Sequence, residues 1–250
     1  KQAGVIRELG LKDLFNSAKA FSNCPIPKGD RIAIVTNSGG PGIMATDAVS
    51  AYGMRMAEIS ESTKAELRSF LPAAASVKNP VDMIASAPLE HYQRTVETVL
   101  ADPGVDMVMV IYLPFLGLKD TDVAKALMDI KAKHPEKPII GCFMTENRFF
   151  TELSDMKVTV PFYMYAEEAV DAMERLNRQR LWMERPEGVV PAFEVKKDAV
   201  RAMFDRVKSE GRTELSTRES MEVLDAYGVR TCRSTFAKTA EEAAAAADAI

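Results

Sequence analysis

Short apolar runs alternate with stretches of mixed polarity along most of this sequence. The strongest run, VDMVMVIYL at residues 105–113, is apolar on both faces, which predicts a central strand of a parallel sheet. Similar short runs predict further strands at residues 31–35, 54–59, 137–143 and 158–162. Between them, apolar residues recur at helical spacing, which predicts helices at residues 43–49, 60–71, 88–101, 120–134 and 166–182.

Strands that alternate with helices predict an α/β fold, namely a doubly wound parallel sheet with right-handed crossovers. We expect the flavodoxin-like order 2-1-3-4-5, with the predicted strands numbered along the chain. In such sheets ligands bind at the carboxyl ends of the strands, near the point where the strand order reverses. The segment TNSGGPG at residues 36–42 directly follows the first predicted strand. The pattern therefore places this glycine turn at the expected ligand edge.

The flanking segments have a different pattern from the central part. Leu11, Leu14, Phe15, Ala18 and Phe21 fall at helical spacing and predict an amphipathic helix before the first strand. The composition changes after Arg185, where a Pro- and Gly-containing linker is followed by charged amphipathic helices. One of these begins with the capping box Ser216–Glu219. These last pieces cannot bury a core alone, so we expect them to open another domain.

Composition and charge exclude several classes of protein. The net charge of −4 and the pI near 5.5 argue against nucleic-acid and anionic-membrane partners. No run approaches the roughly 20 apolar residues that span a bilayer. Cys24, Cys142 and Cys232 lie far apart without CxxC spacing, which favours reduced thiols and a cytoplasmic location. The chain begins with Lys1 and ends at Ile250 within an alanine-rich stretch, so both ends look like cuts in a longer protein.

The glycine turn has two interpretations that the residues alone leave evenly open. Its glycines could simply allow tight packing of a helix against a strand. Alternatively, its backbone N–H groups could bind a phosphate or carboxylate at the positive end of the new helix. The phosphate-binding candidates are Thr36, Asn37, Ser38, Gly39, Gly40 and Gly42. The segment is neither a Walker A loop nor a Rossmann GxGxxG.

A second polar segment, NPVD at residues 79–82, lies in a loop of about a dozen residues. Asn79 and Asp82 either shape an ordinary turn, which the residues alone favour, or face the glycine turn as a supporting loop. The two histidines, His91 and His134, follow no strand end, so neither is proposed as a catalytic base. No cluster has metal-ligand spacing, and we expect no metal site. A phosphoacceptor receiver or a flavin site is disfavoured because the required carboxylates and hydroxyls are missing.

The combination of TNSGGPG at residues 36–42 with NPVD at residues 79–82 resembles the NDP-forming acyl-CoA synthetases. This family includes the ADP-forming acetyl-CoA synthetases and is related to succinyl-CoA synthetase. Residues 1–7 are similar to the end of the family's preceding domain, and residues 224–229 to the opening of its ATP-grasp domain. The resemblance implies three parts. They are the tail of a preceding CoA-ligase domain (1–24), a flavodoxin-like CoA-ligase domain (25–185), and a linker with the start of an ATP-grasp domain (186–250).

The resemblance also implies a reaction. Acyl-CoA, ADP and phosphate are converted into acid, CoA and ATP, through an acyl phosphate and a phosphohistidine. The turn from Ser38 to Gly42 would offer one helix N-terminus to the phosphohistidine, with Asn79 and Asp82 as the supporting loop. The histidine itself is expected before Lys1. The resemblance therefore implies that this chain holds no catalytic residue and is inactive alone.

The same resemblance sets the expected ligands and partners. This fragment should bind no cofactor, whereas CoA, ADP or ATP, and Mg²⁺ belong to the full-length protein. The expected partners are the CoA-binding and ATP-grasp domains and a phosphate or phosphohistidine, without nucleic acid or membrane; a homo-oligomer stays open. An alternative is a regulatory, synthetase-like region fused to a protein lysine acetyltransferase. A histidine before Lys1 would favour the ligase, and an appended acetyltransferase domain the regulator.

Overall fold

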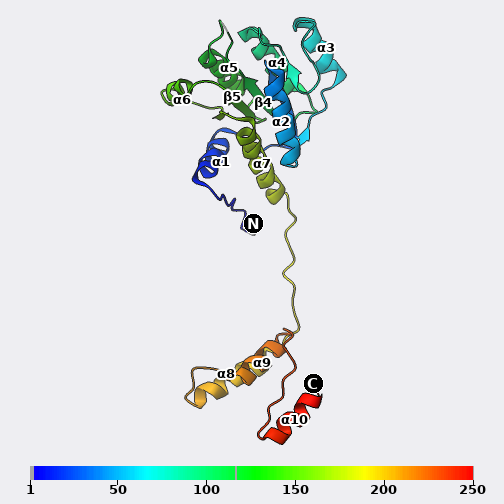
Figure 1. Cartoon of the computed structure of the whole chain (residues 1–250), viewed down its shortest axis with the longest axis vertical. Helices are drawn as coiled ribbons and strands as arrows, with labels where there is room; N and C mark the ends of the chain where they lie inside the picture. The colour runs from blue at the N-terminus through cyan, green and yellow to red at the C-terminus, as the bar shows by residue number, and fades with distance from the viewer. Residues whose placement is uncertain (1–2, 116, 250) are drawn as a thin grey trace. The chain divides into compact units, whose positions relative to one another are not determined.

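The computed structural model describes residues 3–115 and 117–249 and separates the chain into two compact units. The first runs from Lys1 to Pro186 and the second from Glu187 to Ile250. Figure 1 shows the first unit as a sheet covered by helices. No helix among the described residues has the length and apolar character needed to cross a bilayer.

The first unit is built on a parallel sheet with the order β2-β1-β4-β5-β6, which confirms the order expected from the sequence. The strands are β1 (Arg31–Thr36), β2 (Arg55–Met56), β3 (Val81–Asp82), β4 (Met107–Tyr112), β5 (Ile139–Phe143) and β6 (Phe162–Tyr163). The helices are α1 (Leu11–Asn23), α2 (Gly39–Ala51), α3 (Glu61–Phe70), α4 (Leu89–Ala101), α5 (Asp120–Lys133), α6 (Asn147–Ser154) and α7 (Ala166–Met183). The strand order reverses at β1 and β4, which are direct neighbours.

The two faces of the sheet carry separate apolar clusters because side chains alternate along each strand. Ile32 and Ile34 of β1 pack with residues of α2 and α7, whereas Ala33 and Val35 pack with residues of α3, α4 and α5. All six residues of β4 are buried, as its uniformly apolar run predicts. The sheet is thus a rigid support for the loops at its carboxyl edge.

Four local features differ from the expectation. The strand expected at residues 54–59 is paired only over Arg55–Met56, and the loop that contains NPVD includes the two-residue strand β3. Both short strands pair with β1, β2 with its first half and β3 with its second half. The strand expected at residues 158–162 was wrong in its bounds, because only Phe162–Tyr163 pair with β5, as β6. Helix α6 forms in a segment for which we predicted no element.

The second unit contains α8 (Lys197–Ser209), α9 (Thr217–Ala226) and α10 (Ala240–Ala249). The predicted capping box is confirmed, since Ser216 accepts from the Glu219 N–H and Glu219 accepts from the Ser216 N–H. The pKa of the Glu219 carboxyl is lowered chiefly by hydrogen bonds from Arg212 and Ser216. Val200 and Val207 are the buried aliphatic side chains among the described residues of this unit. This unit therefore has little core of its own.

Candidate functional site

Helix α2 begins inside the glycine turn, at Gly39, so the turn is itself the first turn of the helix. Ser38 is the N-cap in extended conformation, and its side chain makes no capping hydrogen bond. The first N–H groups of a helix have no intrahelical acceptor. Pro41 has no N–H, and the Gly42 N–H is bonded to the Ser38 carbonyl at 3.3 Å. The exposed amides of Gly39 and Gly40 are therefore left open at the positive end of α2.

The three glycines of the turn have different roles. None of them has the positive φ that favours glycine. A Cβ at Gly42 would lie 3.3 Å from the Thr36 side chain and 3.6 Å from Pro80, so this glycine allows close packing of α2 on the sheet. A Cβ at Gly40 would meet nothing within 4 Å. Packing thus explains Gly42, while Gly39 and Gly40 form the accessible part of the turn.

Thr36 and Asn37 are buried, and their polar atoms hold the turn in place. The Thr36 hydroxyl donates to the Ser38 carbonyl at 2.9 Å and accepts from the Ser38 N–H at 3.0 Å. The Asn37 carboxamide donates to the Leu113 carbonyl at 2.8 Å and accepts from the Leu113 N–H at 2.9 Å. These bonds tie the end of β1 to the end of β4. Both side chains brace the backbone, and neither projects freely towards a ligand.

Asn79 does not face the glycine turn but completes the sheet. Its carboxamide accepts from the Ile34 N–H at 2.9 Å and donates to the carbonyls of Ile32 and Ala57, at 2.8 and 2.9 Å. The side chain thereby replaces ladder hydrogen bonds in the gap between β2 and β3 on the edge of β1. It follows that β2 is short because a side chain continues its pairing. The bond from Asn79 to Pro80 is cis.

Asp82 is the residue of this loop that does lie at the turn. Its Oδ2 is 3.2 Å from the position of a Cβ on Gly39, while its Oδ1 accepts from the Ile84 N–H at 2.9 Å. Ile84 has φ of 66°, a left-handed conformation that is costly for a β-branched residue. The segment therefore holds a carboxylate beside the open amides. The left-handed conformation of Ile84 could not be predicted from the sequence, because it depends on the surrounding structure.

Exposed apolar side chains follow the glycine turn in α2 and the neighbouring strand end of β4, and sequence reasoning missed them; we call them the apolar border. Ile43 and Met44, in the first turns of α2, are 64% and 51% exposed. Leu113 and Phe115, which follow β4, are also exposed. Since Asn37 binds Leu113, the two ends of this border belong to neighbouring strand ends. The helical spacing that predicted α2 carried a signal for these side chains, but it could not say which of them face solvent.

The other candidate residues lie outside this site. His91 is in α4 beside the ring of Phe70, and His134 ends α5 with Glu136 at 3.8 Å. Burial raises the pKa of the Cys24 and Cys142 thiols to about 12, which keeps them as neutral packing groups. Within residues 3–115 and 117–249, no group of three or more metal-ligating side chains comes together. The site therefore consists of backbone amides, one carboxylate and an apolar border.

Comparison with known proteins assigns this geometry to a family. Residues 32–175 match the family model of the Ligase-CoA domain, and residues 206–250 match that of an ATP-grasp domain. The whole chain aligns with a 4-hydroxybutyrate–CoA ligase [ADP-forming] of Nitrosopumilus maritimus at 34% identity, and the alignment covers 36% of that protein. It also aligns with the acetate–CoA ligase [ADP-forming] II subunit alpha of Pyrococcus furiosus at 43% identity. That alignment covers 58% of this chain and 32% of the subunit. The chain thus spans about a third of the length of these curated relatives.

Solved structures agree with this assignment. The crystal structure of PH0766 from Pyrococcus horikoshii superimposes with a TM-score of 0.67 and 38% identity, covering 74% of this chain and 43% of that one. A dinucleotide-forming acetyl-coenzyme A synthetase of Ca. Korarchaeum cryptofilum, in complex with phosphate and ADP, gives a TM-score of 0.66 and 27% identity, covering 74% of this chain and 42% of that one. The flavodoxin-like sheet and the glycine turn thus occur together in a chain that belongs to the NDP-forming acyl-CoA synthetase family.

Proposed function

We propose that this chain is the part of an ADP-forming acyl-CoA synthetase that receives a phosphoryl group at the N-terminus of α2. The observation that carries the proposal is the pair of open amides at Gly39 and Gly40, at the edge where the strand order reverses. A phosphoryl group on a histidine would approach these amides from another part of the protein. The curated relatives act as ADP-forming CoA ligases, which supports the same reaction for the whole protein.

The physical basis of the proposal is the positive end of α2. Helix-end electrostatics contribute about 0.3–1 kcal/mol at exposed sites and up to about 2 kcal/mol when partly buried. The hydrogen bonds of Thr36 and Asn37 fix the direction of the turn before a ligand arrives. Such preorganised donors stabilise a transferring phosphoryl group without reorganisation. They supply binding and orientation, whereas the nucleophile and the nucleotide site must come from elsewhere.

The reaction then proceeds in three balanced steps. Phosphate displaces CoA from acyl-CoA and forms an acyl phosphate; a histidine takes the phosphoryl group and releases the acid; ADP takes it from the histidine and becomes ATP. Neither His91 nor His134 lies in the segments that form the turn, so we assign the phosphorylated histidine to the rest of the protein. CoA, ADP or ATP, and Mg²⁺ are assigned to the full-length synthetase, and the CoA-binding and ATP-grasp domains are the partners of this unit.

Comparison of the isolated chain with the full-length protein tests this division of labour. Both are incubated with acetyl-CoA and other acyl-CoA thioesters, ADP, phosphate and Mg²⁺, and ATP formation and labelled phosphoenzyme are measured. We expect ATP and an acid-labile phosphoenzyme from the full-length protein and neither from residues 1–250. ATP formation by the isolated chain would contradict the proposal, and so would a phosphorylated His91 or His134.

A further inference from the structure

Helix α1 is amphipathic, but only its C-terminal part, with Ala20 and Phe21, packs its apolar side chains against the core of the domain. Leu11, Leu14 and Phe15 are 74%, 49% and 68% exposed, whereas Ser17 and Ala20 on the opposite face are buried. A helix that packs on a core normally does the reverse. The domain therefore buries the apolar pattern of α1 only in part, and Leu11, Leu14 and Phe15 are available to a partner.

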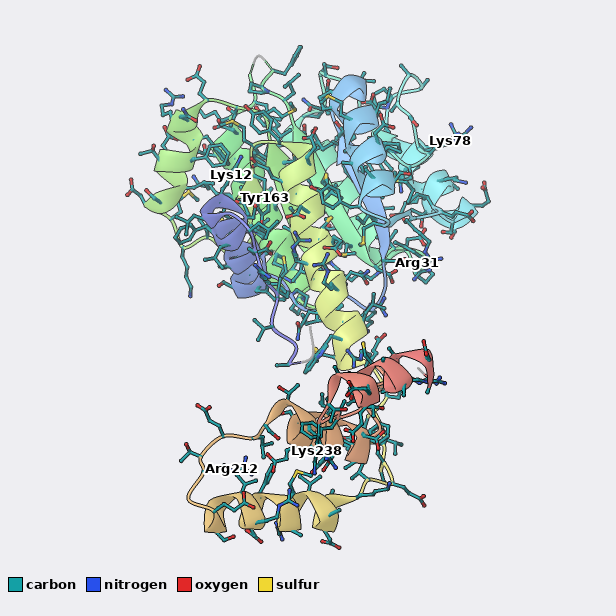
Figure 2. All side chains as sticks on the ribbon, turned by 60° about the horizontal axis from the view of Figure 1, so that its bottom comes forward. Lys12, Arg31, Lys78, Tyr163, Arg212 and Lys238 are labelled. Atoms are coloured by element: carbon teal, nitrogen blue, oxygen red, sulfur yellow. The ribbon has the colours of Figure 1, made fainter. Side chains whose placement is uncertain are left out.

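Polar contacts hold α1 on the domain. The Tyr163 hydroxyl donates to the Asn16 carbonyl at 2.7 Å, and Lys19 donates to the Phe162 carbonyl at 3.0 Å. Figure 2 shows Tyr163 of β6 next to α1, in agreement with this hydrogen bond. Ser17 donates to Glu8 at 2.6 Å. These bonds fix the orientation of α1, so the outward direction of its exposed apolar side chains is determined by named contacts.

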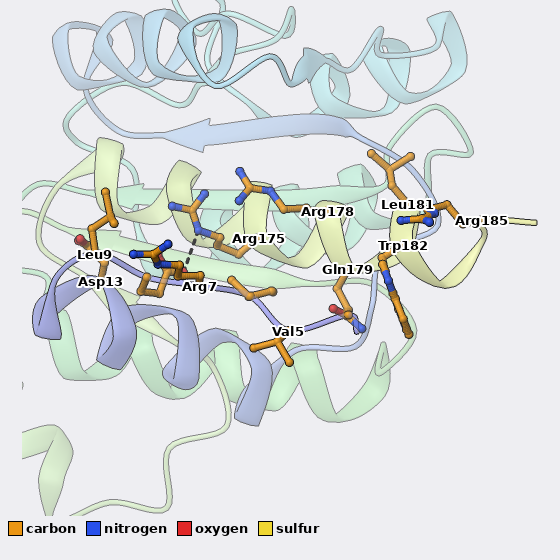
Figure 3. A pocket seen from close by; sticks show the side chains of 13 residues that line it. Val5, Arg7, Leu9, Asp13, Arg175, Arg178, Gln179, Leu181, Trp182 and Arg185 are labelled. Carbon is orange, nitrogen blue, oxygen red and sulfur yellow. Dashed lines mark hydrogen bonds and ion pairs between the residues drawn. The ribbon is translucent and has the colours of Figure 1, made fainter. Parts of the chain in front are cut away.

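The irregular segment from Gly4 to Leu9, which precedes α1, adds two exposed apolar side chains. Val5 and Leu9 are 68% and 91% exposed. With Leu11, Leu14 and Phe15 they form what we call the α1 surface. Glu8 anchors the segment through an ion pair of 2.8 Å with Arg175 of α7. Between the segment and the end of α7 lies a groove of about 1080 Å³, shown in Figure 3.

The groove beside the α1 surface is lined by arginine side chains, of which only some form ion pairs. Arg175 pairs with Glu8 and Asp171, and Arg178 pairs with Glu174. Among the described residues, the guanidinium groups of Arg7 and Arg185 have no hydrogen bond or ion pair, although both line the groove. A partner that covers the α1 surface would therefore bring acidic groups towards Arg7 and Arg185.

Sequence comparison indicates what kind of partner this is. The Ligase-CoA family model covers residues 32–175 and leaves out the α1 surface. Nevertheless, the relative from Nitrosopumilus maritimus aligns with the whole chain, α1 included, and nearly two thirds of its own length lies outside the aligned part. Exposed apolar side chains in a segment that lies outside the matched domain, but aligns with a longer relative, are typical of an interface between domains.

We propose that the α1 surface is the docking site of a neighbouring folded domain in the same, longer polypeptide. That domain presents an apolar centre to Leu14 and Phe15 and acidic side chains to Arg7 and Arg185. The proposal rests on the proposed function only in placing this chain within a longer synthetase. The docking proposal is tested by the protection of side chains from oxidation, whereas the proposed function is tested by ligase activity. Either result can therefore be negative while the other is positive.

Hydroxyl-radical footprinting of the 250-residue chain and of the full-length protein tests the proposal, with Tyr52 at the end of α2 as the exposed reference. We expect the oxidation rates of Leu14 and Phe15 to fall several-fold in the full-length protein at every protein concentration. Equal rates in the two proteins would overturn the proposal. Protection within the isolated chain that grows with concentration would also overturn it, in favour of a second copy as the occupant.

Two pairs of variants sharpen the test. The double variant Leu14→Ser and Phe15→Ser should leave the melting temperature of the isolated chain nearly unchanged, because both side chains are already exposed, and should lower that of the full-length protein. Arg7→Glu with Arg185→Glu should restore fast oxidation of Leu14 and Phe15 in the full-length protein. Arg7→Lys with Arg185→Lys should keep their protection. Protection that survives the charge reversal would overturn the acidic border.

Discussion

Two neighbouring loops at the carboxyl edge of the sheet use their polar groups in opposite ways. The loop from Asn79 to Ile84 directs its side chains into the fold, since Asn79 completes the edge of β1 and Asp82 caps the turn at Ile84. The glycine turn is held equally firmly by Thr36 and Asn37, but it leaves the Gly39 and Gly40 amides open. We therefore propose a binding role for the glycine turn and a structural role for the loop from Asn79 to Ile84.

The glycine turn depends on the loop from Asn79 to Ile84 for its packing. Gly42 allows α2 to approach Pro80 and Thr36, so the loop and the turn pack on each other. Ile84 accepts a left-handed conformation that holds Asp82 beside Gly39. Strained residues of this kind persist where the surrounding structure determines them, and they often occur at functional sites.

Replacing Asn79 should have the largest effect on stability. Asn79→Ala leaves the Ile34 N–H and the Ala57 carbonyl without the Asn79 carboxamide, and each unpaired group costs about 1–3 kcal/mol if water cannot reach it. The Ile32 carbonyl keeps its hydrogen bond from the Ala57 N–H at 2.8 Å. Because Asn79 is half-buried, we expect a total loss of about 3 kcal/mol in urea unfolding. Lys78→Ala, at the exposed neighbouring position, is the control. A loss as small as that of the control would show that the loop is held otherwise.

Replacing Gly42 should have the next largest effect. Gly42→Val places a branched side chain against Thr36 and Pro80, and overpacking of this kind costs about 1–3 kcal/mol. Met44→Val introduces the same residue at an exposed position of α2 and should cost less than about 1 kcal/mol. Thermal unfolding of the two variants measures the difference. Equal melting temperatures would mean that α2 does not depend on close contact at Gly42.

Replacing Asp82 should have the smallest effect on stability, and it should strengthen phosphate binding. Asp82→Asn keeps an acceptor for the Ile84 N–H but removes a negative charge beside the α2 N-terminus, so stability should change by less than about 1 kcal/mol. Phosphate should bind several-fold more tightly, as measured by titration of the Gly39 and Gly40 amide resonances. Asp47→Asn, at an exposed position further along α2, should leave phosphate binding unchanged. Weaker binding to Asp82→Asn would show that Asp82 assists the anion.

Much of the fold follows from local pattern. The uniformly apolar run of β4 identified the centre of the sheet, and alternating strands and helices gave the strand order. The short strand β3 and the inserted carboxamide of Asn79 were not predictable, since they depend on groups that are 22 to 47 residues apart in the chain. Helical spacing likewise predicted α1 without revealing that Leu11, Leu14 and Phe15 are exposed while Phe21 packs against the core.

The candidate site was predicted in part. The place of the glycine turn at the carboxyl edge follows from residue order and from the general rule for α/β sheets. For Asp82 the residues alone favoured an ordinary turn, and its place beside Gly39 is seen only in the structure. The separate roles of Gly39, Gly40 and Gly42 required the packing of α2 against Pro80. Thr36, Asn37 and Asn79 were candidates because they are polar, and only their buried hydrogen bonds show that they brace the backbone.

The most direct test of the account compares Gly39→Pro with Gly39→Ala in the full-length synthetase. Both place a Cβ at the same distance from Asp82, and proline suits the first helical position after the extended Ser38, but only proline removes the N–H. A charge-assisted hydrogen bond of about 1.5–3 kcal/mol corresponds to a roughly 10- to 100-fold effect. We predict that the proline variant forms phosphoenzyme from acyl phosphate slower than the alanine variant by that factor, with equal melting temperatures. Equal rates for two folded variants would contradict the assignment of the Gly39 amide to the phosphoryl group.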